Sequence, residues 1–399
     1  MNDITIIGGG PTGCFTASKL AEKGFEVTIL EEHAEIGQPM CCAGILGARG
    51  LKEIGLDPER LALSELQGAV FHTPAGDSIS LSRDKTEAYV IDRANFDREM
   101  AEKSVRAGAN LHLKSKCIDI SAKEDAVSVR TRNLGSGDTK EIKSRLIIGA
   151  DGPNSFVGRE LGLIKNYEFL NCAQIEAMAD INENTAELYF DNNYSPGFFS
   201  WIIPAGESFR VGLGSLDGGS AQKLMRFIKK HPIASKKIMN KNFSITTGLI
   251  PEPKSRKIYD DRVLLVGDAA GQVKPITGGG LYMGLSCADM AVNVISKALE
   301  NEPTEEELSE YDDLVNQKFG NEFEFGMKAQ KIFREMSNEE ISEVLNLLSK
   351  PGIRELVLEN AEFDHHSKLF KALIERGPNL VTSVGVRKFM KYVNKLVGS

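Results

Sequence analysis

Three glycine-rich segments of this 399-residue chain each follow a short apolar run, and two of them contain an aspartate. The segments are Gly8–Gly13, Gly149–Ser155 and Gly267–Gly271, which read GGGPTG, GADGPNS and GDAAG. A buried strand that runs into a glycine-rich turn presents backbone N–H groups to which a phosphate can bind. One such motif is a weak signal, but three in this order predict a single shared dinucleotide site.

The first motif has the residue types that bind a pyrophosphate. Gly8 permits a tight bend, Gly10 lets the backbone approach the phosphates, and Gly13 lets the following helix pack on the strand. Thr12 is expected inside this turn, and Glu31 is the acidic residue expected about 20 positions further on, for a ribose 2′-hydroxyl. Because a carboxylate repels a 2′-phosphate, the site suits FAD or NAD and suits NADPH poorly.

The third motif predicts a flavin rather than a nicotinamide. The carboxylate of Asp268 follows a strand and can accept hydrogen bonds from a ribityl chain. The loop Pro275–Leu281 includes Gly279 and Gly280 and precedes a long apolar helix. Glycines at a helix start let the backbone lie against a flat ring, with N–H groups directed at its pyrimidine oxygens. We therefore expect FAD.

The elements that position these motifs indicate an α/β fold. Residues 4–31 read as strand, helix and strand, a βαβ start with a right-handed crossover. Residues 92–107 read as a helix and 117–148 as short antiparallel strands. Alternating segments after Gly162 predict a second sheet, and the chain from Gly280 onward reads as helices.

The predicted organisation is a discontinuous Rossmann-like FAD-binding domain, an antiparallel-sheet substrate domain and a C-terminal helical region. The expected limits are 1–70, 90–160 and 255–300 for the first, 71–89 and 161–254 for the second, and 301–399 for the third.

Composition excludes several classes of function. The formal net charge of -8 argues against a nucleic-acid partner. No N-terminal secretory signal is recognisable, and no run approaches the roughly 18 apolar residues that span a bilayer. The six cysteines contain no C-x-x-C pair, so no metal site is expected, and His365-His366 lacks partners at ligand spacing. A reducing, cytoplasmic location fits this pattern.

Together the three motifs resemble those of the flavoprotein hydroxylase superfamily. Two further segments narrow the resemblance to the geranylgeranyl reductase family, with archaeal digeranylgeranylglycerophospholipid reductases as the nearest branch. Gly37–Gly44, which reads GQPMCCAG, is similar to that family's cysteine-bearing loop. Pro196–Pro204, which reads PGFFSWIIP, is similar to its aromatic-x-Trp-x-aromatic-Pro motif. The resemblance covers about the first 300 residues.

The resemblance implies reduction of the trisubstituted double bonds of isoprenoid chains, in archaea those of membrane lipids. The implied FAD contacts are Thr12, Glu31, Cys42, Ala43, Gly44, Arg93, Cys117, Asp151, Asp268, Gly280 and Leu281. Within this set, Arg93 matches an arginine near the phosphates or ribose, and Cys117 matches a backbone contact to adenine. The implied partners are an isoprenoid lipid and an electron donor such as ferredoxin or a reduced nicotinamide nucleotide, and the choice among donors stays open.

Two positions depart from the family pattern, because Phe199 replaces a tyrosine and Ile203 replaces a phenylalanine. The loss of a phenolic hydroxyl matters if that group donates a proton, and matters little if the ring only shapes a channel. The segment Ser200–Pro204 is also similar to a motif of flavin-dependent halogenases. Those enzymes need a catalytic lysine, which the sequence does not identify.

The chemistry of an isolated alkene calls for a proton donor and a dry apolar channel. Cys42 is a candidate donor, with a packing role as its alternative. Trp201, the only tryptophan, is a candidate channel wall together with Phe199, or a core residue. Aromatic residues between 319 and 336 are either core or a lipid-accepting groove, and a peripheral membrane contact stays open.

Three classes of function therefore remain from sequence alone. The favoured one is an FAD-dependent reductase of geranylgeranyl chains. A monooxygenase or halogenase would consume oxygen instead. An electron-transfer flavoprotein dehydrogenase shares the motifs, but the chain lacks the cysteines that would bind its cluster.

Overall fold

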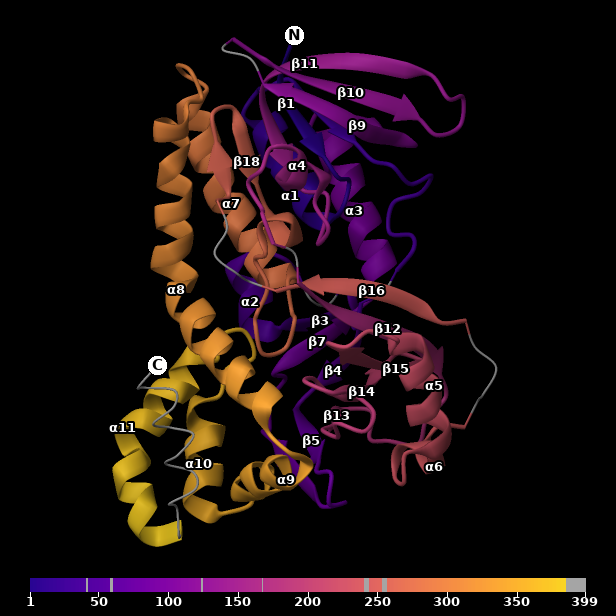
Figure 1. Cartoon of the computed structure of the whole chain (residues 1–399), viewed down its shortest axis with the longest axis vertical. Helices are drawn as coiled ribbons and strands as arrows, with labels where there is room; N and C mark the ends of the chain where they lie inside the picture. The colour runs from indigo at the N-terminus through magenta and orange to yellow at the C-terminus, as the bar shows by residue number, and fades with distance from the viewer. Residues whose placement is uncertain are drawn as a thin grey trace.

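The computed structural model describes residues 1–40, 42–57, 60–122, 125–166, 168–239, 244–252 and 257–384, with side chains as far as residue 376. Figure 1 shows a first sheet with its helices at the top, a second sheet below it, and C-terminal helices along one side. The long helix α8 (Glu305–Glu335) runs beside both sheets.

The first sheet has a parallel core in the order β18-β11-β1-β2-β8. Its strands are β1 (Asn2–Ile7), β2 (Val27–Leu30), β8 (Asn110–His112), β11 (Thr139–Gly149) and β18 (Val263–Leu265), with β17 (Tyr259–Asp260) antiparallel at one edge. Continuous apolar runs such as Ile4-Thr5-Ile6-Ile7 are buried, as expected of parallel strands. Helices α1 (Pro11–Glu22), α3 (Arg93–Arg106) and α7 (Leu281–Ala298) pack with it.

An antiparallel layer extends from β11 at the top of Figure 1. It adds β9 (Ser115–Ala122) and β10 (Val127–Asn133), and β10 pairs with both β9 and β11. Beyond β11, the short helix α4 (Phe156–Glu160) follows the second glycine motif.

The second sheet has the order β16-β12-β15-β14-β13-β5-β6. Its strands are β5 (Gly68–His72), β6 (Ser78–Ser82), β12 (Phe169–Ala177), β13 (Thr185–Tyr189), β14 (Ser200–Ala205), β15 (Ser208–Ser215) and β16 (Thr246–Pro251). Residues that alternate along β14 fall into two separate apolar clusters, and β15 contributes to one of them. One cluster includes Leu224 and Phe227 of α5 (Ser220–Lys230), which lies next to α6 (Ala234–Lys237), and the other contains Phe198 and Trp201.

A small antiparallel sheet, β3-β7-β4, has strands from the first hundred residues. It consists of β3 (Ile45–Gly47), β4 (Ala62–Leu66) and β7 (Ala88–Ile91), and α2 (Ala48–Glu53) follows β3. Leu66, Ala88 and Val90 share an apolar cluster with Trp201 of β14. The cysteine-bearing loop therefore leads into an element that packs on the second sheet.

Two of the C-terminal helices have capping side chains at their N-termini. Thr304 caps α8, and Ser337 and Glu340 form a capping box at α9 (Asn338–Leu347). They are followed by α10 (Pro351–Asn360) and α11 (Ser367–Val384). None of the helices in the described ranges has the length and apolar character needed to cross a lipid bilayer.

The predicted α/β class, the antiparallel second sheet and the C-terminal helices are confirmed. The helix predicted at 92–107 is α3, whose N-cap is Asp92. The proposed domain limits stay a prediction. Strand β5 pairs with β13 and β6, so the N-terminal segment of the second sheet begins at Gly68.

Candidate functional site

The turn between β1 and α1 is shaped for a bound anion. Gly8 has a φ of +108°, and a Cβ there would lie 2.2 Å from the Ala150 carbonyl oxygen. A Cβ on Gly13 would lie 2.1 Å from the Gly8 carbonyl oxygen. By contrast, no atom lies within 4 Å of a Cβ position on Gly10, which is the N-cap of α1 and has no capping side chain. The helix therefore begins without a capping side chain and with free space beside Gly10, which fits a pyrophosphate.

Glu31 lies at the end of β2, beside that turn. Its carboxylate accepts hydrogen bonds from the backbone N–H of Gly9 at 2.7 Å and of His33 at 2.8 Å, and the residue is only 8% exposed. Two backbone donors therefore fix the carboxylate at the edge of the sheet where the predicted ribose would lie. A carboxylate has about four lone-pair sites, so it can accept further hydrogen bonds.

The third glycine motif folds directly against the first. The motif forms a 3₁₀ turn, η1 (Gly267–Ala270). A Cβ on Gly267 would lie 2.9 Å from Thr12 Oγ1, and one on Gly280 would lie 2.7 Å from Asp268 Oδ1. Gly280 is the N-cap of α7 and again has no capping side chain. Thr12 therefore shares one side of the site with Asp268, Gly280 and the adjacent Leu281, although more than 250 residues separate it from these three in sequence.

The second motif uses its acid differently. Asp151 accepts hydrogen bonds from Ser155 Oγ at 2.6 Å and from the N–H groups of Phe156 at 2.7 Å and Val157 at 3.0 Å. Its carboxylate thus caps α4. Burial raises the pKa of Asp151, and these hydrogen bonds oppose the rise. A contact between Asp151 and the cofactor stays a prediction. Because the carboxylate is already hydrogen-bonded, the backbone of Asp151 would make this contact.

The cysteine-bearing loop lies between the two large sheets. The backbone N–H of Gly44 donates to Cys42 Sγ at 3.3 Å, and a Cβ on Gly44 would lie 3.4 Å from Arg93 Cγ. Arg93 forms a two-pronged ion pair with Asp97, both contacts at 3.0 Å. Burial alone would lower the pKa of Arg93, but Cys42 and Asp97 raise it above its ordinary value. A guanidinium therefore stays charged beside the Cys42 sulfur.

Two buried polar residues of the second sheet hold this loop in place. Gln174 donates its amide to the Cys42 carbonyl at 3.1 Å and accepts from Trp201 Nε1 at 3.3 Å. Arg210 donates to the Ala43 carbonyl at 2.8 Å. Gln174 and Arg210 are each 2% exposed. Gln174 thus joins the loop of Cys42 to the indole of Trp201.

An aromatic surface continues from Trp201 on the same side of the sheet. Phe199 lies 6.1 Å from Trp201 and stacks on Phe198 at 4.1 Å between ring centroids. Phe190 lies 5.5 Å from Phe199 and 5.9 Å from Phe333 of α8. The surface is thus built from β14 and the two residues before it, the residue after β13 and the end of α8.

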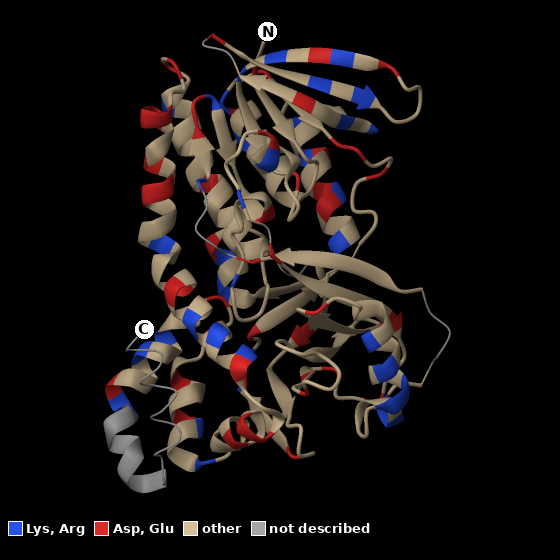
Figure 2. Cartoon of the chain, in the orientation of Figure 1, with Lys and Arg blue, Asp and Glu red and all other residues tan. Residues whose placement is uncertain are grey.

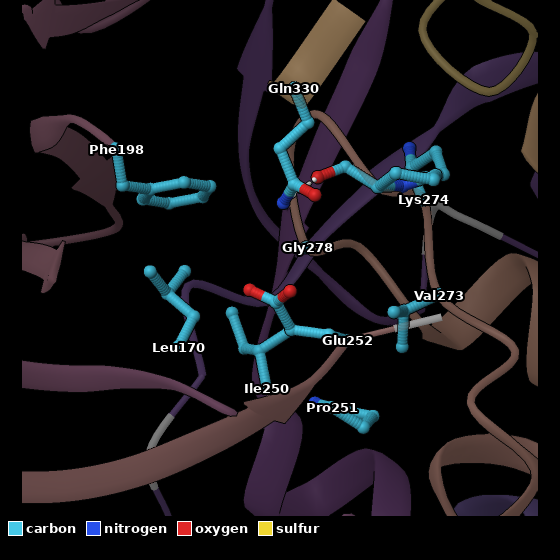
Figure 3. A pocket seen from close by; sticks show the side chains of 10 residues that line it. Leu170, Phe198, Ile250, Pro251, Glu252, Val273, Lys274, Gly278 and Gln330 are labelled. Carbon is cyan, nitrogen blue, oxygen red and sulfur yellow. Dashed lines mark hydrogen bonds between the residues drawn. The ribbon is translucent and has the colours of Figure 1, made fainter. Parts of the chain in front are cut away.

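A cavity of about 10 Å³ lies between this surface and the glycine loop of residues 273–280. Figure 3 shows Phe198 and Leu170 on one side of it and Lys274 and Val273 on the other, with Gly278 between them. This volume suits one water molecule. An isoprenoid chain could therefore lie here only after these side chains move apart.

The structure brings most of the predicted residues into two groups. The first group surrounds the glycine turns and consists of Gly8, Gly10, Thr12, Gly13, Glu31, Asp268, Gly279, Gly280 and Leu281. The second group lines the region between the sheets and consists of Cys42, Ala43, Gly44, Arg93, Phe199 and Trp201. Cys117 lies on β9 and is 7% exposed, and burial raises the pKa of its thiol to about 12. Cys41, expected to be a spacer or core residue, lies outside the described residues.

Sequence reasoning missed Gln174, Arg210 and Lys274. The first two are polar residues inside apolar strands, a pattern that could have identified them as buried partners. Across the described ranges, no group of three or more His, Cys, Asp or Glu side chains is arranged to bind a metal ion.

Comparison with known proteins defines the class first. Residues 1–317 match the family described as "FAD binding domain". That match covers all three glycine motifs, and the helix starts at Gly10 and Gly280, which have no capping side chains, fit the phosphates and ring of the cofactor. FAD is therefore the cofactor of this chain.

More specific relatives share nearly the whole chain. It is 35% identical to digeranylgeranylglycerophospholipid reductase 2 of Methanopyrus kandleri, over 98% of this chain and 99% of the relative. It is 30% identical to the digeranylgeranylglycerophospholipid reductase of Methanocaldococcus jannaschii, over 95% and 96%. A geranylgeranyl bacteriochlorophyll reductase-like protein from Thermoplasma acidophilum shares the fold, with a TM-score of 0.82, 24% identity and coverage of 96% and 98%. The chain belongs to the digeranylgeranylglycerophospholipid reductase family.

Proposed function

We propose that this protein is an FAD-dependent oxidoreductase that saturates the double bonds of geranylgeranyl chains in archaeal glycerolipids. The observation that carries the proposal is the joining of the Cys42 loop to the aromatic surface through Gln174, beside the glycine loop of the flavin site. The family relationship over 98% of the chain supports the same conclusion.

The reaction needs two hydrogens on an alkene that is not electrophilic. Bound at the glycine turns in its reduced form, FAD would supply the hydride for one carbon. The protein must deliver a proton to the other carbon and keep water out. We assign the proton to the Cys42 thiol, because the nearby Arg93 guanidinium stabilises the negative charge left on sulfur when the proton departs. Solvent then returns a proton to the sulfur.

The aromatic surface orients the isoprenoid chain and excludes water from it. Trp201 is 7% exposed, and Phe199 is half-buried beside it. Phe199 has no hydroxyl, so it acts as a wall and not as a proton donor. Burying one large ring against the chain contributes roughly 2–3 kcal/mol of apolar binding.

An external reductant is required, because the reaction consumes two electrons per double bond. Ferredoxin and a reduced nicotinamide nucleotide are the proposed donors. The sequence has no second nucleotide fingerprint, so a small redox protein docking near the flavin is favoured over a second bound nucleotide. Stopped-flow reduction of the enzyme by each donor distinguishes the two.

The lipid substrate brings the protein to a membrane surface, and we propose that the face formed by α5 and α6 docks there. Figure 2 shows Lys and Arg gathered on these two helices. The exposed basic residues are Arg226, Lys229, Lys230 and Lys236. Met178 and Met239 lie next to them, 46% and 60% exposed, and the Met239 N–H donates to the Met178 carbonyl. Basic residues beside exposed apolar side chains suit an anionic bilayer.

Sedimentation with vesicles tests this docking face. Phosphatidylglycerol vesicles should bind the protein and phosphatidylcholine vesicles should not. Lys229→Gln/Lys230→Gln should weaken binding by roughly 1 kcal/mol per charge, whereas Lys140→Gln/Lys143→Gln on β11 removes the same exposed charge elsewhere. Equal losses in both variants would argue against a specific face.

Mass spectrometry of lipid that co-purifies with the protein tests the proposed substrate class. An unsaturated isoprenoid glycerolipid should be found, and it should gain two hydrogens per double bond when the bound flavin is reduced without oxygen. A ligand without isoprenoid double bonds would contradict the proposal.

A further inference from the structure

The glycine loop of the flavin site carries a buried lysine that the proposed reaction does not use. Lys274 is 3% exposed. Its ammonium donates to the Phe363 carbonyl at 2.9 Å and to Asp364 Oδ1 at 3.1 Å, and it lies 4.2 Å from the centre of the Phe363 ring. A segment almost ninety residues away in sequence thus supplies all of these contacts.

The same lysine closes the loop that carries the ring-binding glycines. Its N–H donates to the Gly279 carbonyl at 3.1 Å, and its carbonyl accepts from the Gly278 N–H at 2.8 Å. A Cβ on Gly279 would lie 2.6 Å from Lys274 Cε and 3.2 Å from Nζ. The side chain therefore lies against the backbone that is assigned to the flavin ring.

Asp364, the ion-pair partner of Lys274, is buried and closely packed. It is 3% exposed, and Cβ atoms on Gly47 and Gly50 would lie 2.0 Å and 2.4 Å from its Oδ2, so both glycines are needed for its close approach. Oδ2 has no hydrogen-bond partner among the described residues. Glu322 of α8 anchors the segment, because it accepts from the N–H groups of His366 at 2.8 Å and Ser367 at 3.0 Å.

The ion pair of Lys274 and Asp364 lies between a small cavity and a larger pocket. Lys274 lines the small cavity beside Gly278, as Figure 3 shows. Asp364 lines a pocket of about 400 Å³ between α2 and residues 358–365. The chain of contacts thus runs from Glu322 on α8, through Asp364 and Lys274, to the loop at Gly279.

Folding stability alone does not explain this arrangement. Burial lowers the pKa of Lys274 below its ordinary value, and the neighbouring Asp364 carboxylate opposes that shift. Two apolar side chains of similar volume would serve stability as well as a buried ion pair does. The two charges are therefore better explained by the neighbouring Gly278–Gly280 backbone, which is assigned to the flavin ring.

We propose that Lys274 and Asp364 are positioning residues that hold the Gly278–Gly280 backbone for the flavin ring and balance the charge beside it. The inference rests on the proposed placement of the ring at Gly279 and Gly280. It predicts that the two charges act on the bound flavin in opposite directions. Reduced flavin carries more negative charge than oxidised flavin, so an unbalanced ammonium favours the reduced form and an unbalanced carboxylate favours the oxidised form.

The test is the midpoint potential of bound FAD in the full-length holoprotein. Asp364→Asn should raise the potential and Lys274→Met should lower it. We expect each variant to change the ratio of affinities for reduced and oxidised FAD about tenfold, which is about 30 mV for a two-electron couple. Loss of packing alone would move both variants in the same direction. Lys274→Arg, which keeps the charge, should stay close to the wild type.

Control and fallback variants complete the experiment. Lys297→Met, which breaks an exposed ion pair between α7 and Glu310, should leave the potential unchanged. If a single variant does not fold, the charge-free Lys274→Met/Asp364→Leu should fold and bind FAD at least tenfold more weakly, because the loop loses its anchor. Shifts of equal sign, no shift, or wild-type affinity in the double variant would overturn the proposal. If Asp268→Ala also leaves FAD affinity unchanged, the proposed placement of the flavin fails instead.

Discussion

Glu31 and Asp268 are the carboxylates assigned to the adenosine and flavin ends of the proposed FAD site, and the Glu31 carboxylate accepts two backbone hydrogen bonds. Glu31→Ala and Asp268→Ala should each weaken FAD binding by roughly 1.5–3 kcal/mol, the usual worth of hydrogen bonds to a charged acceptor. Fluorescence titration of the apoprotein with FAD measures this. Glu32→Ala is the matched control, because Glu32 is exposed and pairs with Lys116. Unchanged affinity in both test variants would contradict the assignment.

Cys42 is the residue whose chemistry the mechanism needs most. Cys42→Ser should keep FAD bound, because the carbonyl that accepts from Gln174 is unaffected. It should lower the rate of alkene reduction at least tenfold, because a hydroxyl is a much weaker acid than a thiol. Cys41→Ser, the sequence neighbour, should do much less. If Cys42→Ser turns over at the wild-type rate, Cys42 has only a packing role.

The residues that sequence could and could not predict differ in a physical way. Gly8, Thr12 and Glu31 could be predicted because local spacing after a strand determines their positions. Gln174 could not, because its partners Cys42 and Trp201 lie 132 and 27 residues away. The role of Asp151 was also hidden, since only the structure shows its carboxylate capping α4.

At the scale of elements, β14 and β15 together create the place for the indole. A Cβ on Gly212 of β15 would lie 2.4 Å from Trp201 Cζ2. Both Trp201→Ala and Gly212→Ala should therefore raise the KM for a geranylgeranyl substrate and shorten the lifetime of reduced flavin in air. Steady-state kinetics and flavin reoxidation measure the two effects.

Matched variants separate the channel from general stability. Gly320→Ala on α8 should be silent, because no atom lies within 4 Å of a Cβ there. Phe199→Tyr should also be tolerated, since the ring keeps its place on the aromatic surface. A KM that is unchanged in Trp201→Ala would leave Trp201 as a core residue.

The elements themselves were largely predictable. Buried apolar runs ending in glycine indicated the parallel strands, and alternation indicated the second sheet. The parallel pairing of β5 with β13 was not predictable, because paired residues such as Gly68 and Thr185 lie 117 positions apart in the sequence. The aromatic residues of α8 divide between core and site, as Phe319 is fully buried and Phe333 faces Phe190. Periodicity along one helix cannot make that distinction.

For the whole molecule, His231 should make stability depend on pH. Its Nδ1 accepts from the N–H groups of Ile233 and Ala234, and burial lowers its pKa from 6.5 to about 4. Below pH 6.5 the unfolded chain binds a proton that the folded protein does not. The free energy of unfolding should therefore fall by up to about 1.4 kcal/mol per pH unit between 6.5 and 4.

Urea unfolding at pH 7 and pH 5 measures this dependence. His231→Asn keeps an acceptor for the two N–H groups but does not titrate, so its curve should be flatter over this range. A variant as sensitive to acid as the wild type would show that other groups dominate. Glu187, whose pKa is lowered to about 2 chiefly by hydrogen bonds that oppose its burial, loses its contribution only at lower pH.

The most direct test of the proposed function is turnover without oxygen. Enzyme reduced with dithionite in an anaerobic chamber is mixed with a digeranylgeranyl glycerophospholipid, and the product is analysed by mass spectrometry. We predict a lipid that has gained two hydrogens for each double bond reduced, and no gain with an Asp268→Ala apoprotein. Product that forms only when oxygen is admitted and that has gained oxygen, or unchanged lipid under all conditions, would contradict an isoprenoid reductase.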